Sequence, residues 1–258
     1  MTPDIEKHER AFYAYAAELA RKSDDDPAMI LKITHTRKVV EYASHILSSI
    51  QADPLCTRSA LLGALYHDVG RFEQYLRYGT FRDAQSCNHG QLGVRIIKKM
   101  AFLAQESVQV RRNVLAAVLL HNRFALPADM GARRIVCEIV RDADKLDILR
   151  IIDEHLNSDR PGKPTVILWL PDTDAIWSTK VIDAVLDGVT ASYADLRTVN
   201  DFRLLLGTWY NDLSFAASRQ RYVGDGHARR IILGLPAAGP YEAPKKALLG
   251  RIFGENDK

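Results

Sequence analysis

Hydrophobic residues recur at helical spacing along most of this chain. Between residues 33 and 50, the positions of one predicted helix face are His35, Val39, Tyr42, Ile46 and Ile50. Their spacings of four, three, four and four residues define a stripe that faces the core of an amphipathic helix. His35 is therefore expected on the buried side of this helix, where an imidazole needs a polar partner.

The same spacing predicts helices elsewhere, at residues 4–22, 57–68, 89–104, 107–121, 133–153, 175–192, 195–220 and 242–253. Gly70 is expected to end the helix over 57–68, and residues 71–88 are expected to be irregular. The short apolar run Thr165–Leu170 suits a strand or a buried extended segment. The pattern as a whole predicts an all-α fold.

The organisation expected from this pattern is a single all-α domain over residues 1–258. Within it, a metal core covers about 30–155 and a C-terminal helical extension covers about 165–258. The best candidate linker is Arg160–Pro164, rich in proline and glycine. A separate small second domain is the alternative, since 258 residues suit one large domain or two small ones.

Composition limits the class of protein. Hydrophobic residues make up 47% and the net charge is +3, which is ordinary for a globular protein and too weakly basic for a dedicated nucleic-acid binder. No apolar run approaches the roughly 20 residues that a membrane-spanning helix needs. Three cysteines without a CxxC motif, and a beginning that lacks a signal pattern, favour a cytoplasmic location.

Candidate chemistry begins at His67-Asp68, a pair that closes an apolar helix. Further histidines and one acid share inward positions or helix ends on other predicted helices: His35, His89, His121 and Asp144. Imidazole and carboxylate donors together suit Mn, Fe, Zn, Ni or Co, and Mg less well. Burying such groups unpartnered costs several kcal/mol. A divalent metal satisfies them together, and structural pairs such as His35 with Asp144 or His121 with Asp68 are the alternative.

This ordered set, over about residues 30–155, resembles the HD-domain superfamily of metal-dependent phosphohydrolases. His67-Asp68 matches the pair that names the family, and His35 matches the family's first histidine. Asp144, which is followed by Lys145, matches the closing aspartate. The resemblance implies an all-α fold and a metal site formed by His35, His67, Asp68 and Asp144. The run His67–Gln74 is similar to a bacterial branch of the family from which no substrate is inherited.

His89 and His121 match extra histidines that bind a second metal or contact phosphate in some branches. We expect one ion, with these two residues as proton donors or phosphate contacts, because Asp83 is the only further acid nearby in sequence. Asp68 would then be a catalytic residue as well as a ligand.

The expected activity is hydrolysis of a small phosphorylated molecule, with a metal-activated water as nucleophile. A nucleotide is favoured, because the 71–88 segment carries aromatic residues that can stack on a base. Four cations are candidate substrate-phosphate contacts: Arg71 and Lys145, and more weakly Arg82 and Arg123.

Other functions stay open. A phosphodiesterase acting on a cyclic dinucleotide or nucleic acid is one, although His121 is followed by Asn122-Arg123-Phe124 where that branch has Gly-Tyr-Pro. The Glu-Asp pair of the alarmone hydrolases is also missing. A ligand-binding regulator without turnover and oxygen chemistry at a di-iron site are two more. The expected partner is the small substrate, with no membrane or nucleic acid, and a homo-oligomer is compatible with the sequence.

Overall fold

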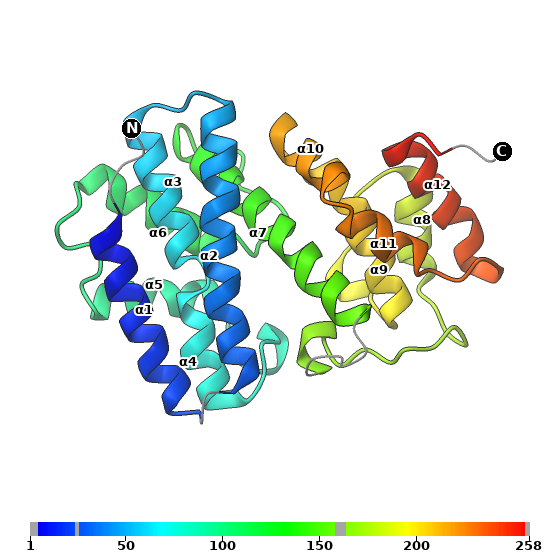
Figure 1. The fold of residues 1–258 in the computed structure, drawn as a ribbon, viewed down its shortest axis with the longest axis horizontal. Helices are drawn as coiled ribbons and strands as arrows, with labels where there is room; N and C mark the ends of the chain where they lie inside the picture. Colours follow the sequence, from blue (N-terminus) through cyan, green and yellow to red (C-terminus); the bar gives the residue numbers. More distant parts are fainter. Residues whose placement is uncertain (1–4, 24–25, 158–163, 256–258) are drawn as a thin grey trace. The chain divides into compact units, whose positions relative to one another are not determined.

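The computed structural model describes residues 5–23, 26–157 and 164–255. Every regular element in these ranges is a helix, which confirms the all-α prediction (Figure 1). The chain divides into two compact units, Met1–Asp147 and Ile148–Lys258. The division falls inside a helix, and of the expected linker Arg160–Pro164 only Pro164 lies within the described residues. The expected single domain with an extension stays a prediction.

The first unit is a bundle of α-helices. They are α1 (Glu6–Arg21), α2 (Pro27–Ser49), α3 (Pro54–Tyr66), α4 (Val69–Tyr78), α5 (His89–Lys99), α6 (Val108–Leu120) and the first part of α7 (Arg133–Leu156), with the short 3-10 helix η1 (Asp83–Gln85) before α5. α3 packs against α2 and α6, and α5 packs against α4 and α6. The buried helix α3 is apolar along most of its length and packs against α1, α2 and α6.

Side-chain caps fix where these helices begin. Asp26 and Asp53 accept hydrogen bonds from the first turns of α2 and α3, each of which has proline at its start. Asn88 caps α5 in the same way, so His89 is the first residue of that helix. Ser107 caps α6. These caps fix the residue at which each helix begins.

The expectations that Gly70 ends a helix and that residues 71–88 are irregular were wrong in part. Gly70 does not end a helix but lies in the first turn of α4, which runs on to Tyr78. A Cβ added at Gly70 would lie 2.2 Å from the backbone oxygen of His89. The glycine is therefore a point of close approach between α4 and the start of α5, a role that looks like a helix stop in the sequence.

The second unit consists of the last turns of α7 and shorter helices: η2 (Pro164–Ile167), α8 (Thr179–Asp187), η3 (Tyr193–Asp195), α9 (Val199–Thr208), η4 (Trp209–Asp212), α10 (Ala216–Gly224), α11 (His227–Leu233), η5 (Gly239–Tyr241) and α12 (Glu242–Phe253). The buried helix α9 packs against α8, α11 and α12. The run 165–170, expected to be a strand or a buried extended segment, begins within the 3-10 helix η2. The helix predicted over 195–220 is split by η4 into α9 and α10. α11 was not predicted.

Membrane insertion finds no support in the described part of the chain, where no helix has both the length and the apolar character needed to span a bilayer. The cytoplasmic location stays a prediction.

Candidate metal centre

Two buried histidines and two aspartates meet inside the first unit. His35 comes from α2, His67 follows the last residue of α3, and their Nε2 atoms are 3.2 Å apart. Asp144 of α7 places Oδ1 at 3.1 Å from the His35 Nε2 and 3.6 Å from the His67 Nε2. Asp68 places Oδ2 at 3.6 Å from each of these nitrogens. The structure thus brings together all four residues expected to share one ion.

A second group of donors adjoins the first. His89 and His121 place their Nε2 atoms 2.9 Å apart. The other oxygen of Asp68, Oδ1, lies 3.4 Å from the first of these atoms and 3.5 Å from the second. Asp68 therefore presents one carboxylate oxygen to each group. The expectation of a single ion rested on a shortage of carboxylates, and an aspartate shared between two groups removes that objection.

Each imidazole has its Nδ1 engaged by the surrounding protein. In His67 and His121 this atom donates to a backbone oxygen three residues earlier, Ala64 at 2.7 Å and Val118 at 2.9 Å. The His35 Nδ1 is 2.7 Å from Asp147 Oδ2, and the His89 Nδ1 is 2.8 Å from both oxygens of Asp83. Carbonyl and carboxylate oxygens only accept, so all four rings carry hydrogen on Nδ1.

This arrangement leaves lone pairs facing one another. With hydrogen on Nδ1, the Nε2 atom of a neutral imidazole is an acceptor, and so the 2.9 Å separation between His89 and His121 sets two acceptors against each other. In the neutral form of His35, its Nε2 faces that of His67 at 3.2 Å in the same way. A cation between the two nitrogens of each pair removes the conflict, because both lone pairs can coordinate it. The donor set therefore fits one divalent ion in each group.

The charge states of these groups suit metal binding. Burial lowers the pKa of His67 to about 4, and burial together with Arg71 lowers the pKa of His89 to about 3. Burial opposes ionisation of Asp68, but the charges of Lys32, His67 and Arg71 hold its pKa well below the usual range. Near neutral pH the two histidines are therefore neutral and the aspartate ionised, which are the forms that coordinate metals.

His35 differs from the other two histidines in the direction of its shift. Burial and the charge of Lys32 oppose protonation, yet hydrogen bonds to Asp144 and Asp147 raise the pKa of this histidine above its usual value. The carboxylates around the first group thus attract positive charge, and a metal ion supplies that charge without a proton.

Two cations flank the carboxylate of Asp68. The Lys32 Nζ is 2.6 Å from Oδ2 and the Arg71 Nε is 3.4 Å from Oδ1, so one cation accompanies each donor group. Both lie over the ring of Phe81, at 5.5 and 5.9 Å from its centroid. Lys32 was missed by the sequence analysis. Its position three residues before His35 on α2, one turn away, is the signal that could have found it.

Three further cations were expected to contact the substrate. Lys145, directly after Asp144, is half-buried. Arg82 is half-buried and Arg123 is exposed. Within the described residues, neither side chain forms a hydrogen bond or an ion pair with a metal ligand. Two histidines left out of the predicted site have partners of their own: His8 bonds to Tyr66 and Glu106, and His227 to Asp153.

Comparison with known proteins gives one family. Residues 32–149 match the model of the HD domain, a range that contains every donor described above and begins at Lys32. Comparison with curated proteins and with solved structures finds no match.

Proposed function

We infer from the membership of this chain in the HD-domain superfamily, together with its donor geometry, that it hydrolyses phosphate esters with two divalent metal ions. His35, His67 and Asp144 would hold one ion, and His89 and His121 the other, with Asp68 between them. The observation that carries this proposal is the facing pair of Nε2 acceptors of His89 and His121, next to the converging ligand atoms of His35, His67 and Asp144. A divalent ion in such a site lowers the pKa of a coordinated water to about 7 and polarises a phosphoryl oxygen.

The chain itself supplies the charge that a phosphoryl group needs. Lys32 and Arg71 stand on the two sides of Asp68, where the oxygens of a bound phosphate would lie. During hydrolysis the oxygen of water bonds to phosphorus, the bond to the leaving oxygen breaks, and the leaving oxygen gains a proton. Negative charge on the phosphoryl oxygens is stabilised by cations held in place beforehand.

His89 and His121 take a different role from the one first expected. A general acid must carry its proton on the nitrogen that faces the substrate, but in both residues the hydrogen is on Nδ1, directed at Asp83 or at the Val118 carbonyl. We therefore assign them to metal binding, which leaves Asp68, Lys32 and Arg71 as the residues closest to the reacting group.

A nucleotide is the substrate class that the surroundings favour. Phe81 lies beneath both cations, and the ring of Tyr75 is 4.8 Å from the Phe81 ring. Aromatic faces next to a phosphate-binding site can stack on a nucleobase while the phosphate meets the cations.

The test is a panel of phosphate esters assayed with Mn, Co, Ni, Fe(II), Zn and Mg. We expect phosphate release from nucleoside monophosphates, and none from cyclic dinucleotides or RNA. Asp68→Ala should be inactive, because both groups lose the shared carboxylate. Release from diesters alone would support the phosphodiesterase alternative. Metal binding with no hydrolysis of any ester would support the regulator, and full activity of Asp68→Ala would overturn the assignment.

Lys32→Met separates the substrate role of this cation from metal binding. The variant should retain its metal and lose about 100-fold in kcat/KM, since a charge-stabilising contact is removed. Lys38→Met on the same helix is the matched control, because Lys38 pairs with Glu41 at the surface. Equal kinetics of the two variants would remove Lys32 from the substrate site.

A further inference from the structure

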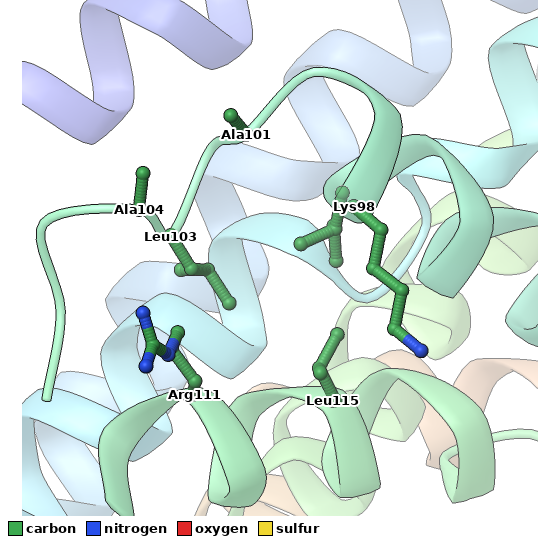
Figure 2. A pocket seen from close by; sticks show the side chains of 7 residues that line it. Lys98, Ala101, Leu103, Ala104, Arg111 and Leu115 are labelled. Carbon is green, nitrogen blue, oxygen red and sulfur yellow. The ribbon is translucent and has the colours of Figure 1, made fainter. Parts of the chain in front are cut away.

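A small cavity lies between the end of α5 and the beginning of α6. Its volume is about 250 Å³, and its walls are mainly apolar: Ile97, Leu103 and Leu115, with Ala101 and Ala104 from the connecting segment. In Figure 2, Leu103 and Leu115 point toward each other, while Lys98 and Arg111 lie to either side. The chain reverses at Ala101, whose φ of 53° is left-handed, and this turn brings Leu103 back over the helices. The hollow is thus apolar inside and basic at its edge.

The two cations at the edge are available to an anionic ligand. Within the residues that the structure describes, neither Lys98 nor Arg111 forms an ion pair. Glu106 is the only acidic residue in the segment that joins the two helices, and it is engaged by Arg58 at 2.6 Å and by His8 at 3.0 Å. Lys98 is exposed and Arg111 half-buried, so both can meet an anion at the mouth of the cavity.

We propose that this cavity binds a free single-chain anionic amphiphile, an alkyl carboxylate such as a medium-chain fatty acid. The apolar walls would hold the alkyl chain, and Lys98 or Arg111 at the edge would bond to the carboxylate. A lone phosphate would leave the apolar walls unfilled, and an uncharged alcohol would leave the cations unpaired. A bilayer is a poorer match, because insertion into a membrane needs apolar side chains that protrude, whereas Leu103 and Ile97 line a hollow.

The proposed site is distinct from the metal centre. His89 begins α5 and His121 follows the end of α6, whereas the cavity lies at the end of α5 and the beginning of α6. At a rise of about 1.5 Å per residue, the eight residues from His89 to Ile97 put the cavity about 12 Å along α5 from the metal donors. Binding here therefore does not depend on the proposed hydrolysis.

Calorimetric titration of the full chain with octanoate, below its micelle concentration, tests the proposal. We expect one octanoate site per chain. Octanol, which lacks the carboxylate, and acetate, which lacks the alkyl chain, should each bind more weakly by about tenfold or more. Lys98→Ala/Arg111→Ala should weaken octanoate binding by about tenfold or more. The matched control is Lys99→Ala/Arg112→Ala, which removes the same charge from neighbouring residues that do not line the cavity, and its affinity should stay within about twofold.

Filling the hollow gives a second, independent variant. Leu115→Trp should block octanoate while the chain stays folded, as judged by its melting temperature and by its retained metal. Three results would overturn the proposal: no binding of octanoate, equal losses in the two double variants, or unchanged affinity in Leu115→Trp. Binding to phosphatidylglycerol vesicles without binding of free octanoate would assign the basic edge to a membrane surface, and would also contradict it.

Discussion

Asp83 is the residue on which the orientation of one metal ligand depends. Its two oxygens accept from the His89 Nδ1 at 2.8 Å, and further donors hold the same carboxylate: Gln74 at 2.9 Å, Asn122 at 3.1 Å and Arg71 at 3.1 Å. Burial opposes its ionisation, but the hydrogen bond from His89 lowers the pKa of Asp83 to about 2. The ionised carboxylate of Asp83 therefore holds the His89 ring in the orientation in which its Nε2 faces His121 and Asp68.

Asp83→Ala should weaken metal binding at the second group by about 10–100-fold, as is usual when the partner of a metal-ligating histidine is removed. Metal binding at the first group should be unaffected, because Asp147 and the Ala64 carbonyl accept the Nδ1 hydrogen bonds of its two histidines. Metal content measured at limiting metal, by elemental analysis of the purified chain, checks this. Asp129→Ala, at an exposed loop position, is the control. Identical metal content in the two variants would refute the orienting role.

At this scale the sequence predicted the donors better than the residues that support them. His35 and Asp144 could be placed because helical spacing puts them on inward stripes, and His67-Asp68 because the pair closes an apolar helix. Asp83 could not be placed, since its contacts depend on the path of a loop, and the one sequence signal for Lys32 is its position one turn before His35. The hydrogen on each Nδ1, which decides between proton transfer and metal binding, also required coordinates.

Helix ends deliver most of the donors to the centre. His67 and His121 follow the last residues of α3 and α6, Asp68 precedes α4, and His89 opens α5. Asp68 occupies the N-cap position of α4, yet its side chain makes no capping bond. Its carboxylate is therefore left to face the histidines, and the packing of α4 against α5 decides how closely the groups approach.

Gly70→Ala tests that packing. A Cβ at this position would meet the His89 backbone oxygen at 2.2 Å, which forces α4 and α5 apart, and we expect a loss of about 1–3 kcal/mol in the free energy of unfolding. Weaker metal binding should accompany it. Gly224→Ala in α10 is the control: it has no atom within 4 Å of an added Cβ, and alanine favours a helix, so no loss is expected. Urea unfolding of both variants gives the comparison, and equal stabilities would contradict the close approach.

A partly buried ion pair joins α1, α3 and the segment before α6. Glu106 accepts from Arg58 at 2.6 and 2.7 Å and from His8 at 3.0 Å, and the bond from Arg58 is the main reason that the pKa of Glu106 falls below its ordinary 4.5. A carboxyl whose pKa is lower in the folded state stabilises the fold above the unfolded value. That contribution is lost as the pH falls through 4.5 and then through the folded value.

Glu106→Gln should therefore cost about 1–3 kcal/mol in unfolding free energy at pH 7, and the difference from the parent chain should shrink below about pH 4.5. Urea unfolding across this pH range measures it. Glu41→Gln is the control, because the pair with Lys38 is 53% exposed on the glutamate side and contributes little. A difference that grows toward low pH would contradict a lowered pKa for Glu106 in the folded chain.

The helices were the elements most open to prediction, because caps such as Asp53 and Asn88 and the helical spacing of apolar residues agree with one another. The failures share a cause. Gly70 has the sequence signature of a helix end but serves as a contact point, and the run near 165–170 is too short for its period to separate a strand from a turn. Tertiary packing decides both cases.

Over the whole molecule, α7 takes part in both compact units. Asp144 and Asp147 lie in the first unit and serve the metal centre. Asp153, further along the same helix, bonds within the second unit to Arg230 at 2.6 Å and to His227 at 2.7 Å. The sequence placed the candidate chemistry in the first part of the chain. It could not place the division between the units, because a helix that continues through the division shows no break in its pattern.

The count of bound metal ions tests the central claim most directly. Elemental analysis of the purified chain after loading with Mn or Co should give two ions per chain. His35→Ala and His121→Ala should each lower the count to one, and Asp68→Ala should weaken both sites, because its two oxygens face the two groups. One ion per chain, unchanged by His121→Ala, would contradict the two-ion centre and return His89 and His121 to the roles first expected of them.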